Sequence, residues 1–374
     1  MRLNRRAMRA VAVMLSERLA GRLDVRSLRA ATLLALAALI ATSKVSRADE
    51  NGISFWIPGL FGSLAATPQQ PGWSLTSIYY HTTVSGGGNI ALSKEISIGQ
   101  FNPALNVNVN ANLHGNGNIG FISPSYVFET PFFGGQASAS VLAAYGRNAA
   151  SLDATIGGSL AGIPLPNRAI DLQQTTWGFG DLAPMFAVRW NAGVNNFMTY
   201  ITGDIPVGLY HSQNLANMGI GHGALDGGAG YTYFNPQTGH EFSVTTGLTG
   251  NFENPSTNYT SGIDWHLDWG ASQFLTKQVQ VGLVGYVYDQ LTPDHGCAPV
   301  LCPFESRVLG VGPQLGYIFP ISPHWQGYLN LKAYGEFDHA NRPDGWNAWL
   351  TFVIAPAAPT QAPSPMVTKA PPHY

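Results

Sequence analysis

The chain has 374 residues, of which 11% are charged, against about 25% in a typical soluble protein. Its net charge is −2, but residues 1–48 hold ten Lys or Arg and two acids, which leaves nine bases and nineteen acids from Asp49 onward. This acidic body argues against nucleic acid as a partner. Low charge, a hydrophobic fraction of 45% and a mean hydropathy near zero favour a transmembrane β-barrel, whose strands alternate lipid-facing and lumen-facing residues.

Residues 1–48 predict a cleavable secretory signal peptide. An Arg-rich stretch precedes the apolar run Ala30–Ala41, which is too short for a membrane-spanning helix of about 20 residues. Ser46-Arg47-Ala48 matches an A-x-A-like cleavage site, so we expect the mature chain to begin at Asp49. An uncleaved anchor is the alternative, and the long basic part leaves Met8 or Met14 open as the true start.

The mature chain divides into three expected parts. Residues 49–71 contain Pro58, Gly59, Gly62 and Pro68 and predict a lead-in or plug-like segment. Residues 72–354 predict the barrel, since no stretch of them has 18 consecutive apolar residues and closed barrels are the other way to cross a membrane. The tail 355–374 holds six prolines and predicts disorder.

Strand signals with a period of two dominate the barrel region. Thirteen strands are clear, at 73–84, 104–114, 118–128, 136–147, 181–191, 195–208, 225–235, 239–250, 258–270, 277–290, 306–319, 323–337 and 345–354. Because single-chain bacterial barrels have an even number of strands, a further strand at 171–177 gives fourteen. If one segment is a loop instead, the number is twelve.

One face of these segments is apolar and the other polar. Between 277 and 291, Val279, Val281 and Leu283 alternate with Gln278 and Gln280. The apolar faces carry almost no Lys or Arg, and Trp or Tyr often lies near a segment end, as in the aromatic girdles of outer-membrane barrels. A soluble sandwich also alternates, so it is this distribution that favours the barrel. The polar faces supply the candidate pore-lining residues Asn106, Asn108, Asn110, Asp264, His266, Asp268, Gln280, Lys332 and Glu336.

Asp264, His266 and Asp268 share one strand face and suggest a titrating constriction that selects ions, although a solvated lumen wall without a specific role is the plainer interpretation. Cys297 and Cys302 lie in a loop-like stretch and predict a short disulfide, because one nearby histidine gives too few ligands for a structural zinc site. The sequence has no G-x-S-x-G and no H-E-x-x-H, so we expect neither an enzyme nor a cofactor.

Several elements occur together in the order typical of one known family. They are Gly178-Phe179-Gly180-Asp181-Leu182, Pro206-Val207-Gly208-Leu209-Tyr210, Asn254 with Thr257, Tyr259 and Gly262, Gly282-Leu283-Val284-Gly285-Tyr286 with Gln290, and Arg307-Val308-Leu309-Gly310-Val311-Gly312-Pro313 before Gly316-Tyr317. From about residue 56 to 354 the chain resembles the outer-membrane transporters of the meta-pathway of phenol degradation. It departs from them at Val207, where the family usually has Thr, and in its proline-rich tail.

The resemblance implies a channel in the bacterial outer membrane for small hydrophobic or aromatic compounds. Its expected partners are outer-membrane lipid, such a solute and the barrel-insertion machinery. A structural or adhesin-like barrel is the alternative function, and a hydrolase built into the barrel is a third. The sequence does not identify a substrate.

Overall fold

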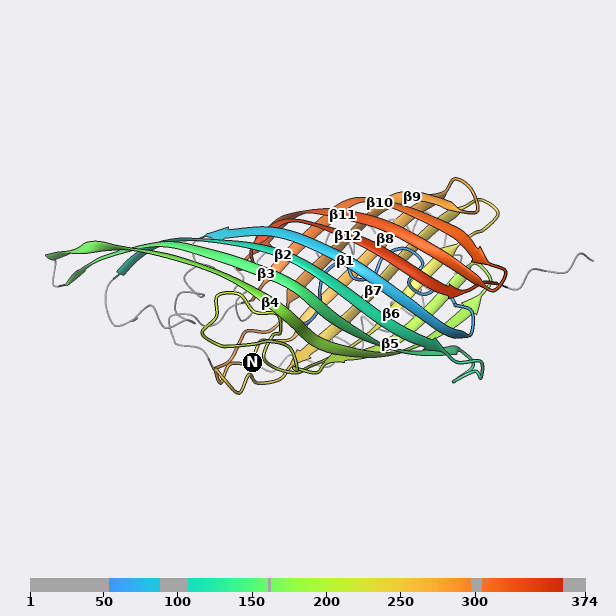
Figure 1. Cartoon of the computed structure of the whole chain (residues 1–374), viewed down its shortest axis with the longest axis horizontal. Helices are drawn as coiled ribbons and strands as arrows, with labels where there is room; N and C mark the ends of the chain where they lie inside the picture. Colours follow the sequence, from blue (N-terminus) through green and yellow to red (C-terminus); the bar gives the residue numbers. More distant parts are fainter. Residues whose placement is uncertain (1–53, 88–106, 161–162, 297–304, 359–374) are drawn as a thin grey trace, which may run out of the picture. The chain divides into compact units, whose positions relative to one another are not determined.

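The structure is a computed structural model that describes residues 54–87, 107–160, 163–296 and 305–358. Within these ranges, twelve antiparallel strands form a closed barrel in which each strand pairs with its neighbours in sequence and β1 pairs with β12 (Figure 1). The strands are β1 (Gly72–Gly87), β2 (Val107–Val127), β3 (Gln136–Leu160), β4 (Ile163–Ala192), β5 (Asn195–Asp204), β6 (Ala224–Phe234), β7 (His240–Asn251), β8 (Asp264–Phe274), β9 (Val279–Gln290), β10 (Arg307–Ser322), β11 (Trp325–Ala340) and β12 (Asp344–Pro356). The predicted all-β antiparallel barrel is confirmed.

The expected number of fourteen strands is wrong, and the alternative of twelve is confirmed. Residues 107–114 and 118–127 of the first two predicted segments belong to one strand, β2, and the segments 171–177 and 181–191 belong to β4. In both places the residues between the two predicted segments include glycines that lie inside a continuous strand.

In β2 the two glycines make room for side chains of the neighbouring strand. Gly115 and Gly117 pair with Val84 and Thr82 of β1. A Cβ atom at Gly115 would lie 3.1 Å from Val84 Cγ2, and one at Gly117 would lie 3.0 Å from Thr82 Cγ2. Glycine in a strand often marks such a close approach, so it does not by itself indicate a turn.

In β4 the glycine-rich stretch 178–181 lies at a β-bulge. The pairing of β3 with β4 shifts register between Ala143 and Tyr145, opposite Leu182 and Phe179. A bulge adds one unpaired residue and bends the strand without ending it. The glycine-rich stretch 178–181 is therefore an irregularity within one long strand.

Each strand has an inner and an outer face, as the alternation predicts. On β9, Gln280 is fully buried inside the barrel, whereas Leu283 is 54% exposed on the outside. On β8, Asp264, His266 and Asp268 are buried, and Trp265 and Leu267 between them are partly exposed on the outer face. The barrel thus has a polar inner wall on this side and an apolar outer surface.

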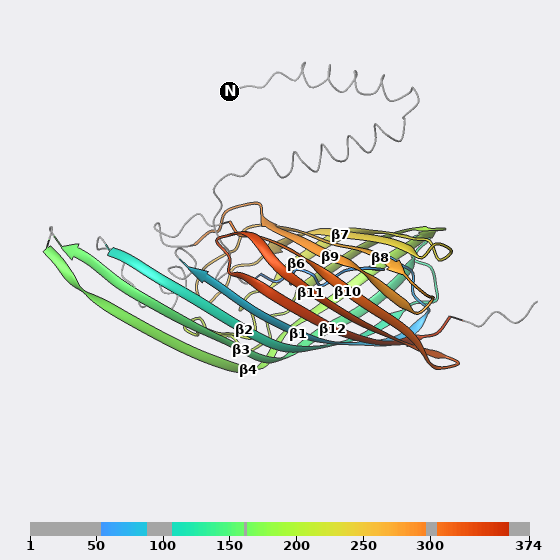
Figure 2. The same ribbon diagram turned by 90° about the horizontal axis from the view of Figure 1, so that it is seen from above.

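The two ends of the barrel differ. At one end short connections join the strands, such as residues 193–194, 275–278 and 323–324. At the other end β3 and β4 run on well past the other strands (Figure 1 and Figure 2), and residues 205–223 form a long connection from β5 to β6.

In the part of the chain that the structure describes, no helix has the length and hydropathy to cross a membrane.

Candidate functional site: the barrel interior

Residues 54–71, which we call the interior segment, run inside the barrel before β1 and hydrogen-bond to its inner wall. The amide of Ala66 donates to Thr232 Oγ1 on β6 at 3.1 Å. The amide of Leu64 donates to Glu241 Oε1 on β7 at 3.0 Å. Further hydrogen bonds join the segment to β3, β4, β8, β10 and β11, through Gln136, Arg189, Asp268, Gln314 and Lys332.

A tight turn of the interior segment is held between an acid and a base of the wall. Asp268 of β8 accepts hydrogen bonds from the amides of Gly59 at 2.9 Å and Phe61 at 3.1 Å. Lys332 Nζ of β11 donates to the carbonyl oxygens of the same two residues, at 2.6 Å and 3.2 Å. Gly59 has a φ of +87° and a Cβ there would lie 3.0 Å from the Tyr334 ring, so the turn requires glycine. Both side chains are buried, and hydrogen bonds that involve a charged group are stronger than neutral ones, so this pair anchors the segment.

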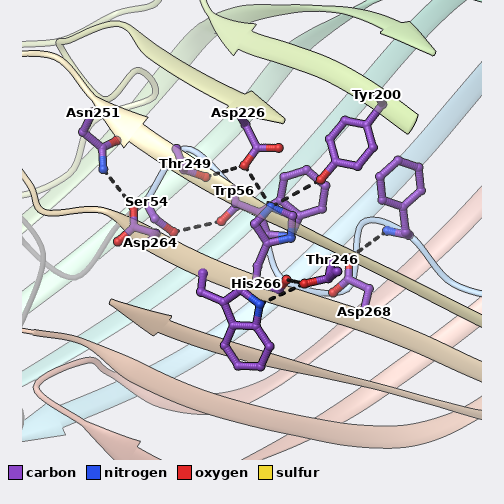
Figure 3. Close-up of polar contacts among 12 residues, drawn as sticks. Ser54, Trp56, Tyr200, Asp226, Thr246, Thr249, Asn251, Asp264, His266 and Asp268 are labelled. Atoms are coloured by element: carbon purple, nitrogen blue, oxygen red, sulfur yellow. Dashed lines mark hydrogen bonds and ion pairs between the residues drawn. The ribbon is translucent and has the colours of Figure 1, made fainter. Parts of the chain in front are cut away.

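Close to this turn, the indole of Trp56 stacks on the imidazole of His266 (Figure 3), with ring centroids 3.7 Å apart and planes 11° apart. His266 Nε2 lies 2.8 Å from Asp226 Oδ2, to which the Thr249 hydroxyl also donates at 2.6 Å. The Tyr200 hydroxyl lies 3.4 Å from the same imidazole nitrogen. The side chains of β5, β6, β7 and β8 therefore fix the orientation of the ring against which Trp56 packs.

The candidate pore-lining residues on β8, β9 and β11 all point into the barrel, but they contact other protein groups. Asp264 accepts from Asn251 at 2.8 Å, and Gln280 donates to Ser272 at 2.7 Å. Glu336 accepts from Tyr286 at 2.7 Å and from the Gly345 amide at 2.8 Å, while Asp268 and Lys332 hold the interior segment. The structure brings Asp268 and Lys332 to one site, which their positions in sequence do not suggest. That Asp264, His266 and Asp268 select ions stays a hypothesis.

Some predicted residues cannot be placed. Asn106 lies outside the described residues, and so do both Cys297 and Cys302 of the expected disulfide. Asn108 and Asn110 lie on β2, where the structure describes the backbone and not their side chains.

Four important interior residues were missed by sequence reasoning: Trp56, Tyr200, Asp226 and Glu241. Asp226 is the single acid in the predicted strand 225–235, surrounded by Gly and Ala, and such an isolated charge is a signal that could have found it. Trp56 gave no such signal, because its partner His266 is distant in sequence.

Beside the interior segment lies a cavity of about 340 Å³, bounded by the segment, by β1–β5 and by the connection 205–223. Most of its lining side chains are apolar, among them Ile57, Leu60, Phe61, Ile78, Phe121 and Met185. A second cavity of about 220 Å³ shares Trp56 and Ile57 with it and extends toward Arg342. The interior therefore has a polar side occupied by the segment and an apolar side that is partly empty.

Asp181 closes the wall beside the larger cavity. Its Oδ1 accepts from the Gly208 amide and its Oδ2 from the Ile220 amide, both at 2.7 Å. The two glycine-containing motifs at 178–182 and 206–210, far apart in sequence, thus meet through one carboxylate. The regular pairing of β4 with β5 ends at Met185 and Thr202. Beyond it, the Asp181 bonds act together with backbone hydrogen bonds from Ile205 and Leu209 to β4 to hold the connection 205–223.

Within the described ranges, no group of three or more His, Cys, Asp and Glu side chains is arranged to hold a metal ion.

Comparison with solved structures shows the fold. An outer-membrane channel from Pseudomonas putida F1 matches at a TM-score of 0.56 and 11% identity, covering 78% of this chain and 98% of the other. A Pseudomonas aeruginosa FadL homologue matches at a TM-score of 0.37 and 10% identity, over 83% and 98% of the two chains. The translocator domain of the autotransporter NalP from Neisseria meningitidis matches at 0.33 and 10%, over 78% and 91%. Identity this low shows similarity of fold with the channel, and the other two scores carry no argument.

No curated protein matches the chain significantly. The model of the family described as putative MetA-pathway of phenol degradation matches residues 93–352, which is well over half of the sequence. The resemblance seen in the glycine-containing motifs is confirmed, and the chain belongs to this family.

Proposed function

We propose that this protein is an outer-membrane channel for the uptake of small apolar molecules, aromatic ones included, and that they bind in the cavity between the interior segment and β1–β5. The observation that carries the proposal is the apolar lining of that cavity. Binding sites for small molecules are mostly concave and apolar, with volumes of about 300–1,000 Å³. A cavity of about 340 Å³ has room for a small aromatic compound.

The polar side of the interior favours an apolar solute over a hydrophilic one. A channel for hydrophilic solutes needs polar groups that face water along the whole path. Here Asp268, Lys332 and Glu241 are buried against the interior segment and hydrogen-bond to its backbone. These three ionisable groups therefore hold the segment.

The outer surface supports a location in a membrane. Apolar side chains such as Leu283, Leu315 and Leu331 are about half exposed on the outside of the barrel. The sheet closes on itself through the pairing of β1 with β12, as a lipid environment requires of membrane-spanning strands. The export signal expected in residues 1–48 and the fold shared with an outer-membrane channel support the bacterial outer membrane in particular.

Two neighbouring alanines of β3 provide a matched test. Ala144 lines the cavity and pairs with the buried Phe121, whereas Ala143 pairs with the outward-facing Ile122. Ala144→Phe should fill the cavity, and Ala143→Phe should add one apolar side chain to the outer surface. We would measure the uptake of a fluorescent aromatic hydrocarbon and of a hydrophilic β-lactam by cells that express each form of the full chain.

Cells with the wild-type chain or Ala143→Phe should take up the hydrocarbon faster than cells without the chain, and Ala144→Phe should remove most of this gain. Uptake of the β-lactam should change little in all of them. If the folded wild-type chain does not accelerate hydrocarbon uptake, the proposal fails and a structural barrel is favoured. If it accelerates uptake equally with Ala144→Phe, the cavity is not on the path.

A further inference from the structure

One carboxyl group of the larger cavity has no partner among the described residues. Asp204 ends β5 and lines the cavity together with Thr202 of the same strand. Among the described residues its side chain makes no hydrogen bond and no ion pair, and its Oδ2 atom is fully buried. A buried polar group without a partner costs free energy, and a charged one costs more. Such a group on the wall of an apolar cavity indicates a ligand that supplies the missing hydrogen-bond partner.

The charges around Asp204 favour a cationic ligand. The described residues that line the cavity include no Lys, Arg or His, and the second acid among them is Asp181. Both oxygens of Asp181 already accept backbone amides, so this carboxylate is occupied by the connection 205–223. His222 is close enough to Asp181 to affect it electrostatically but is not part of the cavity wall. Asp204 thus lies near a second acid, in a cavity whose described lining has no cationic side chain.

We propose that the cavity binds apolar molecules that carry a protonated amine, with the ammonium group at Asp204 and the remainder against apolar side chains such as Ile78, Phe121 and Met185. An ammonium group supplies both the missing hydrogen bond and the missing charge, and a charge-assisted hydrogen bond is stronger than a neutral one. A hydroxyl group would supply the hydrogen bond alone. The inference rests on the proposed function and narrows its substrates to hydrophobic amines.

Three probes with the same aromatic tail separate these chemistries: 4-phenylbutylamine, 4-phenylbutanol and 4-phenylbutyrate. Their affinities would be measured by isothermal titration of the full chain in lipid nanodiscs, with the signal of empty nanodiscs subtracted. For the wild-type chain we expect the amine to bind about tenfold more tightly than the alcohol. The difference in strength between a charge-assisted and a neutral hydrogen bond corresponds to about this factor in the dissociation constant. The carboxylate should bind more weakly than the alcohol.

Asp204→Asn should remove the preference for the amine and leave the affinity for the alcohol within about twofold. Asp153→Asn is the matched control, because Asp153 is exposed on β3 and lines no part of this cavity. This variant makes the same change of net charge and should keep the wild-type order of affinities. The order of the three probes on the wild-type chain tests the inference even if Asp204→Asn does not fold.

Equal binding of amine and alcohol by the wild-type chain would overturn the inference, and so would an amine preference that persists in folded Asp204→Asn. In both cases the cavity still binds apolar molecules and the proposed function stands. If neither probe binds saturably, the cavity is not an apolar binding site and the proposed function fails together with the inference.

Discussion

Lys332→Met should release the interior segment from the barrel wall. Methionine keeps most of the side-chain volume and removes the ammonium group, which donates to Gly59 O at 2.6 Å and to Phe61 O at 3.2 Å. A hydrogen bond that involves a charged group contributes about 1.5–3 kcal/mol, so one short bond with one longer bond amounts to about 3 kcal/mol. The ratio of docked to released segment should therefore fall on the order of a hundredfold.

Hydrogen exchange of peptides from residues 54–71, followed by mass spectrometry of the protein in nanodiscs, would report this change. The amides of Gly59 and Phe61 donate to Asp268 in the docked state, so release of the segment should accelerate their exchange. Lys277→Met is the control, because Lys277 is exposed in the turn before β9. If exchange in folded Lys332→Met equals that of the wild-type chain, Lys332 is not an anchor and the reasoning is refuted.

Two further substitutions test the outer face and the closure at Asp181. Leu283→Arg places a charge on the lipid-facing side of β9 and should destabilise the barrel by about 2–4 kcal/mol, which a loss of heat-modifiable gel mobility would report. Gln278→Arg in the exposed turn should leave the gel mobility unchanged. Equal effects of the two substitutions would contradict the assigned faces. Asp181→Asn has one acceptor oxygen for the amides of Gly208 and Ile220, so it should cost about 1–3 kcal/mol and accelerate hydrogen exchange in residues 205–223. Unchanged exchange there would show that other contacts hold the connection.

The barrel and the assignment of faces could be predicted because both depend on local alternation. Gln280 and Leu283 differ in burial as their places in the pattern require, because successive strand residues point to opposite faces. The number of strands could not be predicted in the same way. Gly115 and Gly117 look like a turn in sequence, but their role depends on Val84 and Thr82, which belong to another strand.

The site was predictable only in part, for a related physical reason. Alternation placed Asp268 and Lys332 inside the barrel, and it predicted a watery wall around them. Whether such groups meet water or protein depends on what fills the lumen, here a turn at Gly59 that is more than 200 positions away in sequence. The same holds for Asp204, whose importance comes from a cavity wall built by five strands and two loops.

Photo-affinity labelling would test most directly the central claim that apolar molecules bind inside the barrel. A small aromatic diazirine would be added to the full chain in nanodiscs, irradiated, and its attachment sites mapped by mass spectrometry. We predict saturable labelling of cavity residues such as Leu60, Phe121 and Met185, which excess toluene suppresses. Labelling confined to outward-facing residues such as Leu283, with no competition by toluene, would contradict it.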